Sequence, residues 1–444
     1  MTTKKVTERE IALDILMEVL ERGSFIHISL FRGLDKYQYL EKQERSFITR
    51  VVDGTVEYLL PIDEAINICS KIRTEKMKPL IRTLLRMSVY QILYMDRVPD
   101  SAACNEAVKL AAARHFSGLK GFVNGVLRNV SRRKDEFIFS DPVLKYSMPE
   151  WILKRWEKDY GWETAERIAE AFLRETPTAV RCNQTLASVE TVKASLRAQR
   201  VEVSQSEYAE DILLLKGYDY LESLDAFQKG WIQVQDLSSS FVGTLAAPAH
   251  GDYVIDVCGA PGGKALHLAD LLQGTGMVEV RDISYQKVSM IEENIDRSGF
   301  QNIRAQVWDA LELHEESVEQ ADVVIADLPC SGLGIIGKKP DIKYRVTEQD
   351  LEELAALQRE ILSVVWKYVK PGGRLVYSTC TIDALENQDN RKWFLENFPF
   401  QPEDISHKLG KGIEEPSMKE GWIQLLPGVH PCDGFFISVF QRTE

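Results

Sequence analysis

Two cysteines follow short apolar segments, and each belongs to a distinct motif. Cys330 ends the segment Ala326-Asp-Leu-Pro-Cys330, and Cys380 ends the segment Val376-Tyr-Ser-Thr-Cys380. A single buried cysteine usually packs as a small apolar residue. Two thiols at the ends of neighbouring strands, one preceded by Asp-Leu-Pro, instead predict nucleophilic chemistry at one edge of a sheet.

Methylation of a pyrimidine carbon is a reaction that needs such a thiol. C5 of cytosine is too poor a nucleophile to take a methyl group until a thiolate adds to C6 and moves electron density onto C5. Charge then develops at N3, and Asp327 beside an apolar strand is expected to keep or share a proton that stabilises it. The second cysteine is expected to assist the final release of the first thiol.

A Gly-rich turn, Cys258-Gly-Ala-Pro-Gly-Gly-Lys264, separates an apolar strand from a helix. Such a turn lets a nucleotide-like cofactor approach backbone N–H groups at the helix N-terminus. A Walker A loop is excluded because Lys264 is followed by Ala265 instead of Ser or Thr. A dinucleotide loop is disfavoured because GxGxxG is absent. The turn of a Rossmann-like methyltransferase remains.

Acidic residues after the next two strands agree with a cofactor of this kind. Asp282 follows the middle glycine, Gly262, by 20 residues. An acid at the end of that strand accepts hydrogen bonds from both ribose hydroxyls. Asp309 follows the third strand and is expected to bind the adenine amino group, although an ordinary loop carboxylate would look the same. The predicted cofactor is S-adenosylmethionine.

Three regions with different patterns are expected to position these residues. Residues 1–140 predict an all-α domain, with Ile11, Ile15, Leu16, Val19 and Leu20 on one helical stripe and a second such pattern from Leu80 to Met95. Residues 141–232 predict a small α+β linker module that begins with one helix over 150–174. Residues 233–444 alternate apolar runs with helix-length segments, which predicts a doubly wound parallel sheet with helices on both faces. The runs span 253–258, 277–281, 303–307, 323–327 and 374–378.

Charge is spread unevenly along the sequence. The net charge of -13 argues against a protein that coats nucleic acid indiscriminately. Residues 1–150 nevertheless hold 24 Lys and Arg against 20 Asp and Glu, so this end is the candidate docking surface for a polyanion. A chance asymmetry between two solvated surfaces would give the same counts.

A basic loop after Cys330 is also a candidate contact with RNA. Its side chains are expected to hold phosphates and stack a base, and the alternative is a solvated basic loop. The candidate residues are Lys338, Lys339, Lys343, Tyr344 and Arg345.

The cysteine count and the N-terminus predict a cytoplasmic protein without a metal. Seven scattered cysteines with no CxxC pair favour reduced thiols over disulfides or a zinc site. The first residues form a charged amphipathic pattern instead of a signal peptide. No uncharged apolar run is long enough to cross a bilayer, so no membrane partner is expected.

The three motifs together resemble those of the Nol1/Nop2/Sun RNA cytosine-5 methyltransferases. Other segments match the same pattern, and the N-terminal helices resemble a NusB-type RNA-binding domain, so the likeness covers nearly the whole chain. These segments are Gln235-Asp-Leu-Ser-Ser239, Lys339-Pro-Asp-Ile-Lys343, Leu425-Leu-Pro-Gly428 and Asp433-Gly-Phe-Phe436.

The resemblance implies roles for particular residues. Cys380 would be the nucleophile, Cys330 would act in product release, and the target would be cytidine 967 of 16S rRNA. That base would come from a single-stranded loop or be flipped out of a stack. The sequence departs from the family pattern at two positions. Gly259 stands where the family usually has Ala, and Lys287 stands where an Arg often follows the ribose-binding strand. S-adenosylmethionine contacts would come from Cys258, Gly259, Ala260, Pro261, Gly262, Gly263, Lys264, Asp282, Asp309 and Asp327.

Two other functions remain as alternatives. A DNA cytosine-5 methyltransferase would use the Pro-Cys thiol of Cys330 as its nucleophile, and the Thr-Cys motif argues against it. An RNA-binding assembly factor without activity would need only the N-terminal helices. The complete cofactor turn and both thiols argue against such a factor.

Overall fold

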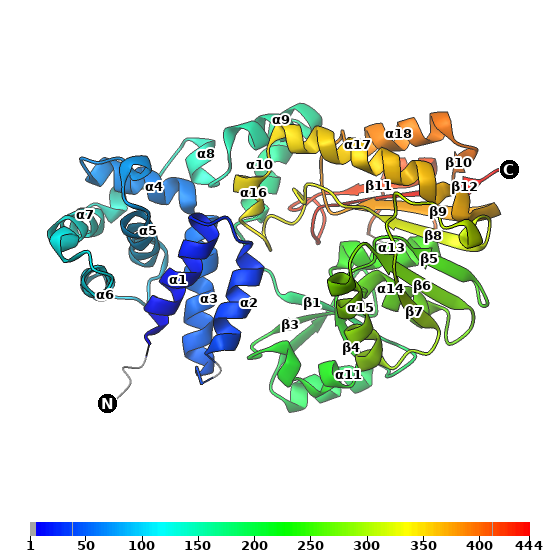
Figure 1. Ribbon diagram of the computed structural model, residues 1–444, viewed down its shortest axis with the longest axis horizontal. Coiled ribbons are helices and arrows are strands. Elements are labelled where there is room, and N and C mark those ends of the chain that lie inside the picture. The colour runs from blue at the N-terminus through cyan, green and yellow to red at the C-terminus, as the bar shows by residue number, and fades with distance from the viewer. Residues whose placement is uncertain (1–5, 38, 411) are drawn as a thin grey trace. The chain divides into compact units, whose positions relative to one another are not determined.

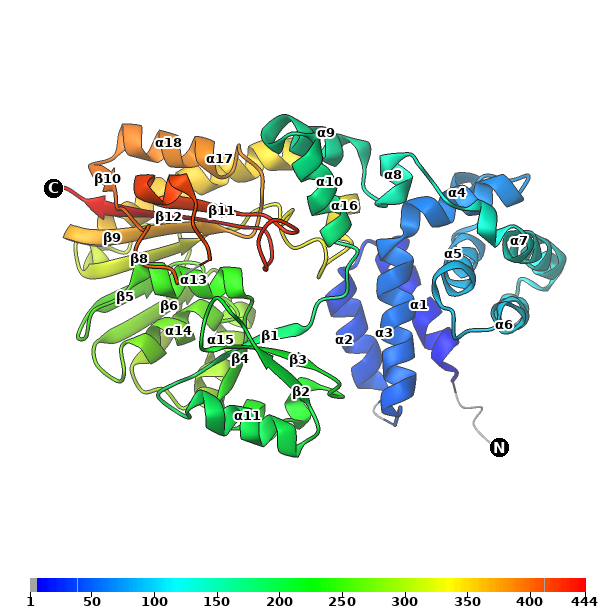
Figure 2. The same ribbon diagram turned by 180° about the vertical axis from the view of Figure 1, so that it is seen from behind.

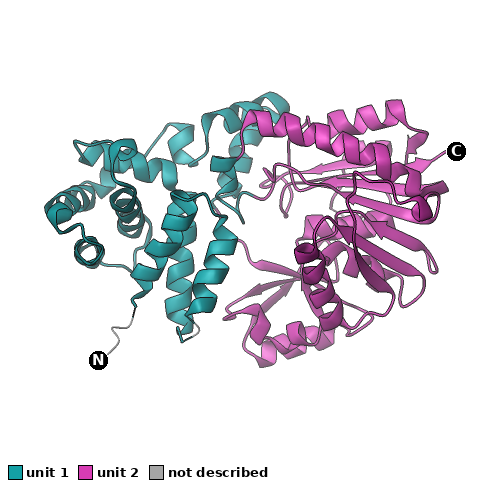
Figure 3. Cartoon of the chain, in the orientation of Figure 1, with its two compact units in different colours: residues 1–173, 336–345 teal, residues 174–335, 346–444 magenta. Residues whose placement is uncertain are grey.

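The computed structural model describes residues 6–37, 39–410 and 412–444 and divides into two compact units (Figure 3). Unit 1 contains the chain up to Leu173 together with Ile336–Arg345. Unit 2 contains Arg174–Ile335 and Val346–Glu444. The division into three domains at 140 and 232 therefore stays a prediction.

Unit 1 is entirely helical, as the apolar stripes predict. Thr7 caps the first helix in a capping box with Glu10, and the predicted stripe residues Ile11 and Ile15 are buried. Pro79 occupies the first turn of the fifth helix, where its missing N–H costs nothing. The helices are α1 (Glu8–Leu20), α2 (Ile26–Lys36), α3 (Lys42–Glu57), α4 (Leu59–Cys69), α5 (Pro79–Tyr94), α6 (Asp100–Ala113), α7 (Lys120–Arg132), α8 (Pro142–Lys145), α9 (Glu150–Tyr160), α10 (Trp162–Ala171) and α16 (Ile342–Arg345).

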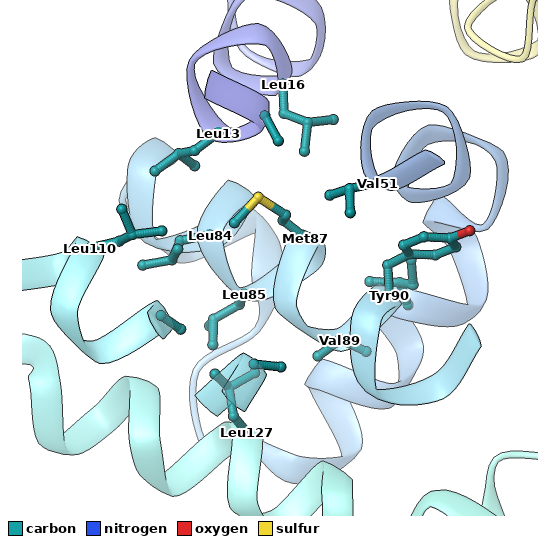
Figure 4. Packing of buried hydrophobic residues seen from close by; sticks show 14 of the residues in the cluster. Leu13, Leu16, Val51, Leu84, Leu85, Met87, Val89, Tyr90, Leu110 and Leu127 are labelled. Carbon is teal, nitrogen blue, oxygen red and sulfur yellow. The ribbon is translucent and has the colours of Figure 1, made fainter. Parts of the chain in front are cut away.

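The core of unit 1 is built around α5. Leu84, Leu85 and Met87 of this helix point into a cluster completed by the surrounding helices (Figure 4). Gly54 of α3 lets the Tyr90 ring pack against the helix backbone, because a Cβ at this glycine would lie 2.0 Å from the ring. Each fully buried Leu side chain contributes roughly 1.5–3 kcal/mol, so the cluster explains why the helices pack as one body.

The prediction of a single helix over 150–174 is wrong in one respect. The structure has two helices, α9 and α10, which meet at Gly161. This glycine has a φ of 79° and a ψ of 156°, a conformation that side-chain-bearing residues rarely adopt. The apolar pattern continues across the break because both helices bury a face, with Trp156 1% exposed.

Unit 2 begins with a small antiparallel sheet in the order β2-β3-β1-β4. Its strands and helices agree with the α+β character that the sequence predicts for this module. Arg181 of β1 is fully buried and its guanidinium lies 3.5 Å from the Asp270 carboxylate, which ties this sheet to α14 (Gly263–Leu271). The elements are β1 (Thr178–Cys182), α11 (Val189–Ala198), β2 (Glu202–Gln205), β3 (Ile212–Lys216), α12 (Asp225–Gln228) and β4 (Ile232–Val234).

The larger sheet of unit 2 follows the order β10-β12-β9-β8-β5-β6-β7, with β11 paired to β12 (Figure 1). Five neighbouring strands from β9 to β7 are parallel, as predicted. The fully parallel prediction is wrong beyond β9, because β12 runs antiparallel to it. The strands are β5 (Tyr253–Asp256), β6 (Met277–Asp282), β7 (Ile303–Val307), β8 (Ala321–Asp327), β9 (Val369–Thr379), β10 (Phe400–Pro402), β11 (Trp422–Leu425) and β12 (Phe435–Arg442).

Helices cover both faces of this sheet (Figures 1 and 2). α17 and α18 pack on one face, and α13, α14 and α15 pack on the other. The carboxyl ends of the parallel strands therefore meet at one edge between two helical layers, where ligands of such sheets bind. The helices are α13 (Leu237–Ala246), α14 (Gly263–Leu271), α15 (Tyr285–Ser298), α17 (Glu348–Val365) and α18 (Gln388–Asn397).

Across the described ranges, no helix is both long and apolar enough to cross a membrane. The same ranges hold no group of three His, Cys, Asp or Glu side chains arranged to bind a metal ion.

Candidate active site

The two cysteines lie side by side at the carboxyl ends of β8 and β9. These strands pair in parallel with Asp327 opposite Ser378, which carries both motifs to the same edge. The Cys330 and Cys380 sulfur atoms are 3.4 Å apart. The hydrogen bond to Cys380 and burial raise the pKa of Cys330 well above its usual value. Cys330 therefore stays a thiol at neutral pH.

Asp327 is held by two partners beside this pair. The Lys264 ammonium lies 2.6 Å from its Oδ2, and the Ser378 hydroxyl donates to its Oδ1 at 2.8 Å. Burial alone would lower the pKa of Lys264, but the charge of Asp327, with further contributions from Asp256 and Cys380, raises it. Lys264 is thus a fixed positive charge that interacts with both Asp327 and the Cys380 sulfur.

The predicted cofactor turn leaves backbone N–H groups of a helix N-terminus open to a ligand. Gly262 adopts a φ of 105° and precedes α14, whose N-terminus is not capped by any side chain in the described part of the chain. A Cβ at Gly263 would meet no atom within 4 Å, so this face of the turn is open. At Gly259 a Cβ would lie 2.2 Å from Val280 Cγ2. The packing around this position therefore explains why the chain has Gly where the family usually has Ala.

The acidic residues predicted to hold the cofactor line a pocket of about 310 Å³. Asp282 Oδ2 accepts from Ala260 N at 3.1 Å, and Asp282 Oδ1 accepts from Ile283 N at 2.8 Å, which fixes the carboxylate at the end of β6. Lys287, the other departure, also pairs with Asp282 Oδ1 at 2.9 Å. Of the predicted catalytic and cofactor residues, the pocket lining includes Cys258, Ala260, Asp282, Asp309, Asp327, Cys330 and Cys380.

These features fit S-adenosylmethionine. The turn offers uncapped N–H groups to a carboxylate, and the strand-end acids offer acceptors to hydroxyl and amino groups. Both cysteines open onto the same pocket, as a methyl transfer to a thiol-bound base requires. The individual cofactor contacts stay predictions.

The basic loop lies in unit 1, where several of its side chains have structural roles. Lys343 is 2% exposed and donates to Glu57 O at 2.8 Å, and burial lowers its pKa to about 7. The Tyr344 hydroxyl lies 3.2 Å from Ser147 Oγ, and its ring packs against the helical core. Both side chains therefore have structural roles within unit 1, and their contact with RNA stays a prediction.

The remaining basic residues differ in their exposure. Arg345 donates to the carbonyls of Gly23 and Ser24 at 2.6 and 2.9 Å, so it too anchors the segment within unit 1. Lys338 is exposed and Lys339 partly exposed, and their contact with RNA stays a prediction.

Sequence reasoning missed two buried carboxyls near the cysteines. Glu386 accepts hydrogen bonds from Ser331 and Gln358, and Asp256 lies at the end of β5 with no hydrogen-bond partner for either side-chain oxygen among the described residues. Burial and the charge of Asp327 raise the pKa of Asp256 to about 7. No motif marks Glu386, and Asp256 is one residue of an otherwise apolar strand.

Comparison with known families identifies all three regions. The model of the 16S rRNA methyltransferase RsmB/F family matches residues 243–441. The NusB family model matches 6–132, and the ferredoxin-like domain of RsmF/B-like methyltransferases matches 148–219. The probable ribosomal RNA small subunit methyltransferase B of Bacillus subtilis is 36% identical, over 99% of each chain. The chain belongs to the RsmB family of small subunit rRNA methyltransferases.

Structural comparison agrees with membership of the RsmB family. The crystal structure of PH0851 covers 99% of this chain and 100% of its own, with a TM-score of 0.83 and 26% identity. NSun6 from Pyrococcus horikoshii with SFG covers 67% of this chain and 98% of its own, with a TM-score of 0.60 and 22% identity, which shows a shared fold. The RsmB family uses S-adenosylmethionine, so the predicted cofactor is confirmed.

Proposed function

We propose that the protein transfers a methyl group from S-adenosylmethionine to C5 of a cytidine in 16S rRNA, namely cytidine 967, through a covalent bond between Cys380 and C6. The observation that carries this proposal is the 3.4 Å separation of the Cys330 and Cys380 sulfurs at one wall of the pocket that Asp282 and Asp309 also line. A single thiol could be structural, whereas two in contact beside a cofactor pocket support covalent catalysis.

In the first half of the reaction the Cys380 thiolate attacks C6. A sulfur–carbon bond forms, the C5–C6 double bond opens, and its electron pair becomes available at C5 while negative charge spreads toward N3. The Lys264 ammonium, 2.6 Å from Asp327 Oδ2, stabilises the Cys380 thiolate before the attack. As charge develops at N3, Asp327 shares with N3 the proton that it holds together with Lys264. Bound S-adenosylmethionine supplies the methyl group that C5 takes.

In the second half the proton leaves C5 and the enzyme is released. A base removes the C5 proton, its electron pair restores the C5–C6 double bond, and the sulfur–carbon bond breaks to return Cys380 as a thiolate. Cys330 stays a thiol beside that sulfur, because burial and the contact with Cys380 raise its pKa. It therefore supports the departing thiolate with a hydrogen bond.

The rest of the chain is proposed to bind the RNA and present the target cytosine. A cytosine reaches the thiols only when extruded from a stack or taken from a single-stranded loop. The proposed RNA contacts are the NusB-type helices within 1–140, the α+β module within 141–232, the exposed Lys338 and the partly exposed Lys339. The methyltransferase domain is assigned to 233–444. The proposed site of action is the cytoplasm, where bacterial rRNA is made.

The proposal is tested with labelled S-adenosylmethionine and 16S rRNA stripped of its modifications. The wild-type protein is expected to label one cytidine at C5. Cys380→Ala is expected to abolish turnover, and Cys330→Ala is expected to accumulate a protein–RNA adduct that survives denaturing electrophoresis. Cys69→Ala in unit 1 is the matched control and should behave as the wild type.

Three outcomes would overturn parts of the proposal. Turnover by Cys380→Ala together with loss of turnover in Cys330→Ala would assign the nucleophile to the Pro-Cys thiol, as in DNA cytosine-5 methyltransferases. No incorporation into any RNA would favour a binding factor. Label at a cytidine other than 967, mapped in cells with and without the gene, would reject the assigned nucleotide.

A further inference from the structure

Glu386 is a buried carboxyl that joins the two cysteine motifs. It lies in the loop between β9 and α18, and its side chain is fully buried. Ser331 N donates to its Oε2 at 3.0 Å, and the Ser331 hydroxyl donates to its Oε1 at 2.5 Å. Gln358 Nε2 donates to Oε2 at 2.9 Å. The carboxyl thus accepts three hydrogen bonds, two of them from the residue next to Cys330.

Gln358 extends this contact to the other side of Cys330. Its Nε2 also donates to Pro329 O at 2.9 Å, so the residues before and after Cys330 are both tied to the Glu386–Gln358 pair. The orientation of the amide is fixed, because its Oε1 accepts from Asn390 Nδ2 at 2.8 Å while its Nε2 makes the two donations above. Cys330 is therefore held by partners that cannot rotate freely.

The same network reaches Cys380 through its neighbour. Ser331 Oγ lies 2.7 Å from Thr381 Oγ1, and Thr381 directly follows Cys380. Tyr377, three residues before Cys380 on β9, donates from its hydroxyl to the Glu386 backbone carbonyl. One buried side chain thereby connects the flanks of both thiols, whose sulfurs are 3.4 Å apart.

We propose that Glu386 is a positioning residue that sets the distance between Cys330 and Cys380 and so allows Cys330 to assist release of the methylated base. This role rests on the proposed covalent mechanism. Glu386 contacts neither the base nor the cofactor, and it acts through Ser331, Gln358 and Thr381.

The chemistry of the network predicts which substitutions preserve it. Burial raises the pKa of Glu386 to about 7, against the lowering effect of the Ser331 hydrogen bonds. Gln fits the same site, because its oxygen can accept from Ser331 N and Gln358 while its amide group donates to Ser331 Oγ. The Ser331 hydroxyl then donates to Thr381. Ala removes the acceptor of three buried hydrogen bonds and frees the Cys330 loop to move.

The experiment compares Glu386→Ala, Glu386→Gln and Thr381→Val in single-turnover and steady-state methylation of stripped 16S rRNA. A displacement of about 1 Å at a reacting group costs on the order of 100-fold in rate. Glu386→Ala is therefore expected to lose about 100-fold in turnover and to accumulate the denaturation-resistant adduct. Glu386→Gln should recover to within about tenfold of wild type. Adduct accumulation needs a working nucleophile, so a protein that is merely unfolded cannot produce it.

The control is Glu352→Ala, at an exposed position of the same α17 that carries Gln358. The positioning role is overturned if Glu386→Ala matches this control, or if it loses turnover without adduct while keeping its melting temperature and its affinity for S-adenosylmethionine. Where Glu386→Ala does not fold, Thr381→Val decides, because it removes the bridge to Ser331 and otherwise only the 3.4 Å hydrogen bond from Asp383 N to Thr381 Oγ1. Wild-type turnover and no adduct in that variant reject the role.

Failure of the covalent mechanism itself gives a different result. In that case Cys380→Ala retains turnover, whatever Glu386→Ala does. Failure of the positioning role alone leaves Cys380→Ala inactive and Cys330→Ala trapped as an adduct.

Discussion

The buried carboxyl of Asp256 is expected to make the free energy of unfolding depend on pH. The side chain is fully buried at the end of β5, and neither of its carboxyl oxygens has a hydrogen-bond partner within the described ranges. Burial, with the nearby charge of Asp327, raises its pKa from 3.8 to about 7. The folded protein therefore favours the protonated acid, whereas the unfolded chain ionises it above pH 3.8.

The consequence is a loss of stability as pH rises. The contribution of Asp256 is complete below pH 3.8, falls between pH 3.8 and about 7, and is level above that. At about 1.4 kcal/mol per pH unit, the total loss is about 4 kcal/mol, of which about 3 kcal/mol falls between pH 5 and pH 8. Asp256→Asn is neutral at every pH and has the shape of the protonated acid, so it escapes this loss.

Calorimetric melting of wild type and Asp256→Asn from pH 5 to pH 8 measures the effect. The variant is expected to gain stability over wild type as pH rises, with a melting temperature of unit 2 about 5–10 °C further above wild type at pH 8 than at pH 5. Asp296→Asn, at an exposed position of α15, is the control and should show no such trend. A difference between Asp256→Asn and wild type that is constant with pH, or that favours wild type at pH 8, would refute the reasoning.

Three further variants test other features of the site. Lys264→Met is expected to lower kcat by about 100-fold, because the ammonium pairs with Asp327 and is a positive charge beside the Cys380 sulfur. Calorimetric titration of S-adenosylmethionine tests the predicted cofactor contact of Lys264 separately, and a loss of affinity as large as the loss of kcat would assign the ammonium to the cofactor alone. Lys343→Met is expected to leave rRNA affinity unchanged and to raise the melting temperature of unit 1 at pH 6 more than at pH 9, because the buried amine has a pKa of about 7 and its ammonium is costly to bury at the lower pH. Weakened RNA binding by Lys343→Met would instead identify Lys343 as an RNA contact. Gly259→Ala is expected to destabilise the fold by about 1–3 kcal/mol, because the new Cβ would lie 2.2 Å from Val280 Cγ2 and 2.9 Å from Asp256 Oδ2. Val280→Ala in the same chain should relieve only the part that comes from Val280, and urea unfolding of the single and double variants measures it.

The sequence alone determined the five parallel strands of the larger sheet and the motifs at their ends. Apolar runs, Gly-rich turns and strand-end acids are local patterns, and β5, β6, β7, β8 and β9 lie where those patterns predict them. Parallel order among these strands then brings Cys330 and Cys380 to one edge, because each strand is followed by a connection that returns to the same end of the sheet.

Only the tertiary structure decided which charged side chains are buried. Lys343 looks like a solvated base in the sequence, and its burial comes from helix α3, whose Glu57 lies 286 residues away. Glu386 acquires its place from Ser331, 55 residues earlier. The antiparallel β12 likewise follows from pairing that periodicity does not encode. Burial and pairing depend on contacts between distant segments, and no local pattern of residue types carries that information.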